Sequence, residues 1–251
     1  MESTLDRNQA PAVQLNKQIN YIVPERYETA QGIPVFVMRN ETSEAVKLDL
    51  MFDAGSIYHD SPAAGLTAGL LLAGTPEKTM AEINDAIDDF GGYFNASVSA
   101  DFAYLSMFGL NESTTAIVSL IEQALFTATF PEEELIQLKA ERKQNLMVSL
   151  EKVSTLAQRS FQENLFKGTP YGRVNQPEDL EGVTRTEIIA FYEKHIKCGL
   201  RKINWVGNPT EAQLHAVIAC FSRWENTASL PSVPKPNPDH STINIEKKDA
   251  V

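Results

Sequence analysis

Residues 63–96 read AAGLTAGLLLAGTPEKTMAEINDAIDDFGGYFNA, and this stretch decides the fold. Its first part, up to Leu72, is apolar and poor in β-branched residues, which predicts a buried helix. A capping box follows, because Thr79 stands three residues before Glu82, and it predicts a second helix that ends at the glycine pair beginning with Gly91. The stretch therefore predicts two helices and then a return to strand.

Strand patterns lie on both sides of this stretch. Residues 35–38 and 46–52 are predicted as a pair of strands, and the second alternates apolar residues on one face. Residues 94–109 also have a period of two, which predicts two further strands joined by a tight turn near Ala100 and Asp101. These patterns predict a sheet in which some strands pair with the strand next to them in the sequence.

The remaining chain is mostly helical in pattern. The predicted elements are helices at 112–128, 131–168 with a break near 151–154, and beyond the capping box at Thr184, then a strand at 202–206 and a helix at 209–224. Strand pairs thus alternate with groups of helices. This order predicts the α+β class, with an antiparallel sheet flanked by helices.

Composition divides the chain into three parts. Residues 1–29 are polar and without a clear period, which predicts an extended N-terminal arm. Residues 30–226 hold all the patterned segments and are predicted to form one domain. Residues 227–251 begin with a Pro-rich stretch, and residues 242–246 begin a new strand-like run, so we expect a linker and the truncated start of a second domain.

Charge and hydropathy exclude several partners. The 251-residue chain has 22 basic and 33 acidic residues, a net charge of −11, and no basic cluster, so we expect neither nucleic acid nor an anionic membrane surface as a partner. The sequence contains no run of 18 apolar residues, which argues against a membrane span. No signal-peptide pattern opens the chain, and we expect a soluble protein, cytoplasmic or exported after removal of a signal.

Residues of known catalytic chemistry do not cluster in the sequence. The 4 histidines and 2 cysteines have no spacing typical of metal ligands, and the two thiols are predicted to be incidental or buried. The sequence lacks a nucleophile elbow, a phosphate-binding glycine loop and a dinucleotide fingerprint. No cofactor is therefore expected, and these patterns alone predict an α+β domain without a defined activity.

An ordered series of short motifs nevertheless resembles the pitrilysin/insulinase metallopeptidases, the family that includes the mitochondrial processing peptidases. The series spans about residues 30–225. Its parts are Gly55-Ser56, AGLTAGLLLAGT at 64–75, GGYFNA at 91–96, PYGR at 170–173, Phe191-Tyr192 and Val206-Gly207. The resemblance implies the fold of one half of a clam-shaped peptidase.

The same resemblance implies that the zinc site is missing. Active members carry His-x-x-Glu-His just before a Gly-Thr pair, and alignment on Gly74-Thr75 places Gly65, Ala68 and Gly69 at the two histidines and the glutamate. The third ligand of active members, a glutamate on the long helix, corresponds to the window 145–149, which has no carboxylate. The chain is expected to hold no metal and to be inactive alone. The small residues also suit a helix face that a neighbour approaches closely.

The resemblance implies a partner and a binding role. We expect pairing, as a dimer or within a longer chain, with a zinc-bearing homologous subunit or domain to form a chamber for peptides. Residues Asn95, Ala96 and Ser97 are predicted to offer a strand edge to a substrate peptide, and Arg173 to contact it. The alternatives are an ordinary paired strand and a surface ion pair of the arginine.

Two other functions stay open at this point. The chain fits an assembly scaffold without proteolytic role, or a zinc protease whose site lies elsewhere, with His59, His195 or His215 converging on carboxylates. Long-range steering by the negative net charge favours basic peptides slightly.

Overall fold

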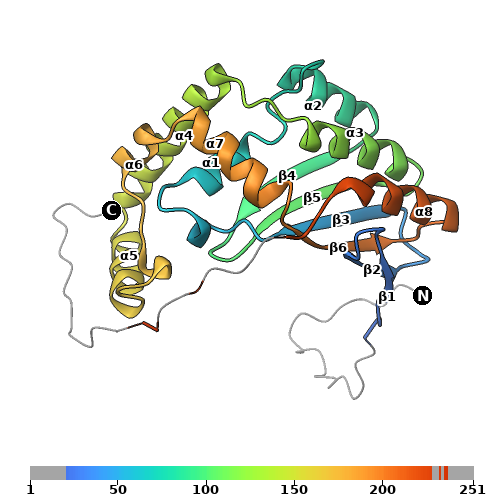
Figure 1. The fold of residues 1–251 in the computed structure, drawn as a ribbon, viewed down its shortest axis with the longest axis horizontal. Coiled ribbons are helices and arrows are strands. Elements are labelled where there is room, and N and C mark those ends of the chain that lie inside the picture. Colours follow the sequence, from blue (N-terminus) through green and yellow to red (C-terminus); the bar gives the residue numbers. More distant parts are fainter. Residues whose placement is uncertain (1–20, 228–231, 233–234, 237–251) are drawn as a thin grey trace, which may run out of the picture.

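The structure is a computed structural model that describes residues 21–227, 232, 235 and 236. Its strands are β1 Glu25–Glu28, β2 Pro34–Arg39, β3 Ala45–Phe52, β4 Tyr93–Val98, β5 Ala103–Leu110 and β6 Leu200–Gly207. Its α-helices are α1 Ala63–Gly69, α2 Met80–Asp89, α3 Thr114–Phe126, α4 Glu132–Leu150, α5 Val153–Leu165, α6 Pro177–Gly182, α7 Arg185–Phe191 and α8 Glu211–Cys220. Helices lie along one side of the sheet, and α4, α5 and α6 extend beyond its end (Figure 1).

The strands form one six-stranded sheet in the order β1-β2-β6-β3-β5-β4. All the pairings are antiparallel except that of β2 with β6, where Val35 lies opposite Ile203. Sheet and helices together confirm the predicted α+β class, and the parallel pair makes the sheet mixed. Within the described residues, β4 has one ladder partner, β5, and therefore forms an edge of the sheet.

The core lies between the sheet and its helices. Alternate residues of the central strands are buried on one face, among them Leu48, Leu50, Ile203 and Trp205, each at most 1% exposed. The residues between them, such as Asp49, are only partly buried because they lie on the opposite face. This alternation is the pattern of a sheet with one covered face.

Two expectations about the strands were wrong in detail. Residues 35–38 and 46–52 form strands as predicted, but they do not pair with each other, because β6 lies between β2 and β3. The pairing was inferred from closeness in sequence, whereas β6, which buries Leu200, Ile203 and Trp205, occupies the position between them. The segment predicted as an extended arm also contains a strand near its end, because Glu25–Glu28 pair with β2. The sheet thus begins before residue 30.

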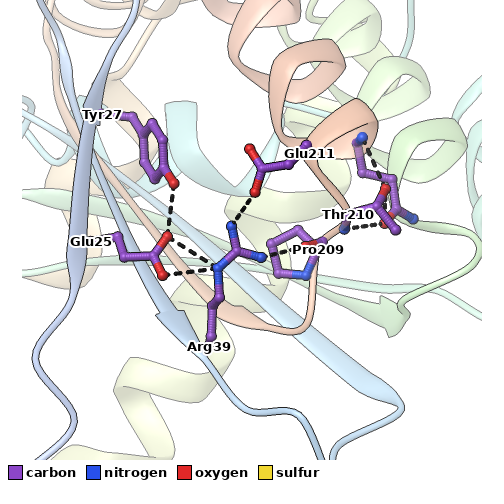
Figure 2. Close-up of polar contacts among 7 residues, drawn as sticks. Glu25, Tyr27, Arg39, Pro209, Thr210 and Glu211 are labelled. Atoms are coloured by element: carbon purple, nitrogen blue, oxygen red, sulfur yellow. Dashed lines mark hydrogen bonds and ion pairs between the residues drawn. The ribbon is translucent and has the colours of Figure 1, made fainter.

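A polar network holds this outer strand to the sheet and to α8 (Figure 2). The Arg39 guanidinium donates to both carboxylate oxygens of Glu25, at 2.9 and 3.0 Å, and to the Pro209 carbonyl at 2.6 Å. It also donates to Glu211 at the start of α8, at 2.7 Å, while the Tyr27 hydroxyl donates to Glu25. One side chain of β2 therefore connects β1 with the helix that follows β6.

Most predicted helices begin at the residues that the capping patterns indicate. The Thr79 and Thr184 side chains each accept from the backbone N–H three residues later, which confirms both capping boxes. The predicted break near 151–154 separates α4 from α5. The helix predicted for residues 63–72 ends earlier, at Gly69, and turns follow it.

The predicted linker, the predicted second domain and most of the predicted N-terminal arm fall largely outside the described residues. Residues 1–20, 228–231, 233–234 and 237–251 lie outside the described residues, so the predicted linker and second domain stay predictions. In the described part of the chain, no helix has both the length and the apolar character that a membrane crossing requires.

Candidate functional site

A cleft of about 640 Å³ lies between α1, the edge strand β4, the helices α4 and α5, and the loop that contains Pro170–Gly172. It brings together residues that are far apart in the sequence. Of the positions predicted for the metal motif and for substrate contact, those that line the cleft are Gly65, Ala68, Gly69, Ala96, Ser97 and Arg173. Asn95, also predicted to contact substrate, is exposed and does not line it.

Helix α1 presents bare backbone to the cleft. A Cβ atom built on Gly65 would meet nothing within 4 Å, so this position faces open space. A Cβ atom on Gly69 would lie 2.9 Å from Leu138 Cδ2 and 3.8 Å from Arg142 Nη2, both on α4. The close-approach interpretation of the small residues therefore applies to Gly69 and not to Gly65. Ala68 is 4% exposed.

Helix α4 provides the opposite wall of the cleft. Its lining side chains are Arg142 and Leu146, of which only the second lies in the window predicted for a third zinc ligand. Arg142 lies outside the window but on the same helix face as Leu146, because positions 138, 142 and 146 are four residues apart. Sequence reasoning missed Arg142, although the apolar spacing of Leu138 and Leu146 indicates this face.

The residues around the cleft do not fit a zinc ion. Zinc requires thiolate, imidazole or carboxylate ligands, and α1 offers Gly65, Ala68 and Gly69 while α4 offers a guanidinium and an aliphatic side chain. A guanidinium is cationic and donates hydrogen bonds, so it cannot act as a metal ligand. Among the residues that the structure describes, no group of three or more His, Cys, Asp or Glu side chains is arranged to hold a metal.

Strand β4 borders the cleft with its free edge. Across the turn to β5, the Ser99 N–H donates to the Phe102 carbonyl at 2.8 Å, and Ser97 and Asn95 lie opposite Tyr104 and Ser106. In an antiparallel ladder, hydrogen-bonded pairs alternate with pairs whose N–H and C=O groups point outward. The outward positions are Phe94, Ala96 and Val98.

Arg173 lies at the rim of the cleft. Its guanidinium donates to the His59 carbonyl and forms an ion pair with Asp60, whose side chain is 98% exposed. The neighbouring Tyr171 hydroxyl donates to Asp101, next to the β4–β5 turn. The arginine is thus both a cleft-lining residue and a surface ion-pair partner, and its contacts join the Pro-Tyr-Gly loop to the segment before α1.

His59 and His195 both pack against the Phe191 ring. His195 is 6% exposed and sits in the π-helical turn Tyr192–Ile196, with its ring 4.9 Å from Tyr58 and 4.8 Å from Phe191. Burial, aided by the charge of Lys194, lowers the pKa of His195 from 6.5 to about 4. His59 accepts hydrogen bonds from Ser61.

The other two histidines are His215 and His240, and neither lines the cleft within the described residues. His215 is an exposed residue of α8, and His240 lies outside the described residues. Within the described part of the chain, the histidines and carboxylates therefore form no ligand set of the kind that a zinc protease with a different site requires.

Comparisons with known proteins agree with this arrangement. The model of the insulinase family, peptidase family M16, matches residues 35–175. An uncharacterized zinc protease of Rickettsia felis is 22% identical over 182 residues, which cover 70% of this chain and 44% of that protein. The uncharacterized zinc protease YmxG of Bacillus subtilis is 25% identical over 114 residues, covering 44% of this chain and 28% of the relative.

Solved structures share the fold. A peptidase M16 inactive domain from Pseudomonas fluorescens superposes with a TM-score of 0.77 at 21% identity, covering 85% of this chain and 54% of that one. A protease from Helicobacter pylori superposes with a TM-score of 0.73 at 16% identity, covering 87% and 54%. The chain thus spans about half the length of these structures and less than half of the two sequence relatives.

A helix-covered sheet with a free edge strand beside a short glycine-bearing helix is the arrangement of a peptidase-type domain, and the positions predicted for its metal ligands carry no metal-binding groups. Within this class, the family match over residues 35–175 makes the assignment specific. The chain belongs to the insulinase family, peptidase family M16.

Restoring part of the zinc motif is expected to fail. In the variant Ala68→Glu/Gly69→His, the third ligand and the histidine at position 65 are still absent, and the new imidazole collides with Leu138. We expect no bound zinc, no peptide cleavage, and a loss of about 1–3 kcal/mol from overpacking. Metal analysis, a fluorogenic peptide assay and urea unfolding measure the three quantities.

The matched control is Gly65→His, which places the same side chain in open space and should leave stability nearly unchanged. Chelator-sensitive cleavage by the double variant would show that the motif alignment is wrong.

His195 is expected to make stability depend on pH. Because its pKa is lower in the folded state, at about 4, than the ordinary 6.5, the unfolded chain binds the proton first as the pH falls. Its contribution to stability is therefore complete above pH 6.5 and is lost between pH 6.5 and 4, by on the order of 3 kcal/mol. Urea unfolding of His195→Phe across this range should show a flatter profile, whereas the exposed-site control His215→Phe should keep the original slope.

Proposed function

We propose that this chain is a non-catalytic half of an insulinase-family peptidase, which pairs with a zinc-bearing homologue to form a peptide-processing chamber. One observation carries the proposal: the cleft keeps a free strand edge beside α1, while the metal-ligand positions on α1 and α4 carry no metal-binding side chain. A surface for peptide binding is thus combined with an absence of catalytic groups at these positions. The Pseudomonas fluorescens structure with this fold is described as an inactive domain, which supports the same interpretation.

In this proposal β4 binds the peptide backbone. The outward N–H and C=O groups of Ala96 and its neighbours are placed to continue the sheet with one more strand, as in β-augmentation. The small side chains of Ala96 and Ser97 leave this backbone accessible from the cleft. Asn95 lies on the exposed face of the strand, where it would contact a peptide beyond the cleft, and Arg173 would contact it at the rim.

An assembly scaffold without proteolytic role is the second candidate. The relatives named as zinc proteases and the open cleft favour the chamber over the scaffold, since a scaffold has no need of an accessible strand edge beside a cleft. The decisive difference between the two functions is cleavage in the presence of a partner.

The first test measures metal and activity in the assembled state. The chain alone should contain no stoichiometric zinc and cleave no peptide. Mixed with a zinc-bearing insulinase-family chain from the same genome, it should form a stable complex with chelator-sensitive cleavage that exceeds that of the partner alone. Size-exclusion chromatography, metal analysis and a fluorogenic peptide assay provide these readouts. A stable complex with no gain in cleavage would favour the scaffold, and stoichiometric zinc in the isolated chain would refute the proposal.

The second test removes one outward donor from the strand edge. Ala96→Pro deletes an N–H that points away from β5, so it removes no ladder hydrogen bond, and proline is tolerated at strand edges. We expect peptide affinity to fall by about tenfold or more, because one backbone hydrogen bond is lost and the proline ring hinders the approach of the added strand. Calorimetric titration with an extended peptide measures the change.

Ala96→Ser is the matched control, because it keeps the N–H and should bind as the unaltered chain does. Equal affinities of the proline and serine variants would show that peptides do not bind along β4.

A further inference from the structure

The charge of the cleft is opposite to the charge of the chain. The protein carries a net charge of −11. Among the described residues, however, the charged side chains that line the cleft are three, Arg142, Arg159 and Arg173, and all are arginines. No carboxylate, lysine or histidine in the described part of the chain lines it. This reversal of sign calls for a ligand that bears negative charge.

Arg142 is the arginine with the greatest freedom to bind. It is exposed on α4, and it forms no hydrogen bond or ion pair with the residues that the structure describes. Its Nη2 atom lies 3.8 Å from the position of a Cβ on Gly69, directly over the bare part of α1. An arginine guanidinium presents a planar fork of donors that matches a carboxylate in two parallel hydrogen bonds.

Arg159 and Arg173 contribute unequally. Arg159, half-buried on α5, donates to the Asn175 carbonyl at 2.6 Å, a neutral acceptor that orients the guanidinium and leaves its charge in place. The positive charge of Arg173 is already balanced by its ion pair with Asp60 at the rim of the cleft. The uncompensated positive charge of the cleft therefore comes from Arg142 and Arg159, on two helices that face β4 across the cleft.

We propose that the cleft selects peptides that carry a carboxylate, as an acidic side chain or as the C-terminal group, which Arg142 and Arg159 bind. This inference rests on the proposed function, since the peptide is held along β4. Side chains of an added strand alternate between its two faces. Those on the side of α4 and α5 are directed toward the two arginines.

Contacts within the cleft affect the affinity for a charged peptide more than the net charge of the whole chain does. Distant acidic groups act through solvent, where the Debye length is about 8 Å at physiological ionic strength, whereas a carboxylate in contact with a guanidinium is little screened. A hydrogen bond to a charged group contributes about 1.5–3 kcal/mol, which corresponds to roughly tenfold or more in affinity. The slight preference for basic peptides expected from net charge is thus reversed in the cleft.

The test compares four peptides on the full chain by isothermal titration calorimetry. The first is acetyl-Ala-Val-Glu-Val-Glu-Val-Ala-amide, and two others replace both glutamates by glutamine or by lysine. The fourth is the glutamine peptide with a free C-terminal carboxylate. We expect the glutamate peptide to bind about tenfold more tightly than its glutamine counterpart and the lysine peptide most weakly. Tighter binding of the fourth peptide than of its amide identifies the terminal carboxylate as a ligand, and equal binding assigns the site to side chains.

Arg142→Gln and Arg159→Gln assign the preference to the cleft. Each should reduce the advantage of the glutamate peptide about threefold and leave the binding of the glutamine peptide unchanged. Arg26→Gln is the control, because Arg26 is an exposed arginine of β1 whose ion pair with Glu28 lies outside the cleft. Circular dichroism verifies that all three variants fold.

The outcomes separate this inference from the proposed function. Equal or tighter binding of the lysine peptide, a carboxylate preference that persists in both cleft variants, or no binding of any carboxylate peptide would overturn it. If all peptides bind equally and Ala96→Pro weakens them equally, the charge selection is wrong and the strand-edge function stands. If glutamate peptides bind through the arginines but Ala96→Pro has no effect, the carboxylate site stands and the strand-edge function is wrong.

Discussion

The approach of α4 to α1 over Gly69 is the contact on which the cleft depends. With no side chain at this position, Leu138 lies where it would collide with a Cβ, at 2.9 Å, and Arg142 follows one turn later above the same helix. Helix α4 continues into the helical extension seen beyond the end of the sheet in Figure 1. The missing side chain at Gly69 thus sets how closely the two walls of the cleft approach one another. It also brings the Arg142 guanidinium over the part of α1 that carries Gly69.

The absence of metal-binding groups and the shape of the cleft are linked. The small residues on α1 supply neither metal ligands nor bulk, and the space at Gly65 stays open. The strand edge of β4 does not depend on those ligands, because its geometry comes from pairing with β5 and from the turn at Ala100 and Asp101. The cleft therefore has an accessible strand edge although its walls carry no metal-binding groups.

Sequence patterns predicted the local elements well and the long-range pairings poorly. The capping boxes at Thr79 and Thr184 depend on neighbouring residues, so their helices are where the sequence indicates. The insertion of β6 between β2 and β3 brings together segments about 160 residues apart, and no local pattern contains that information. Asn95, Ala96, Ser97 and Arg173 were predicted from the family resemblance to contact a substrate; the last three line one cleft and Asn95 does not. Arg142 was missed because it lies three residues before the window examined for a third zinc ligand.

The free edge of β4 has a further consequence for the behaviour of the chain in solution. An exposed strand edge is a template for sheet-to-sheet pairing between copies, and proteins protect such edges with charge or with a covering element. Here α1 packs beside β4, and the arginine-bearing helices α4 and α5 line the cleft that this edge borders. These neighbouring elements therefore hinder edge-to-edge pairing between copies of the chain.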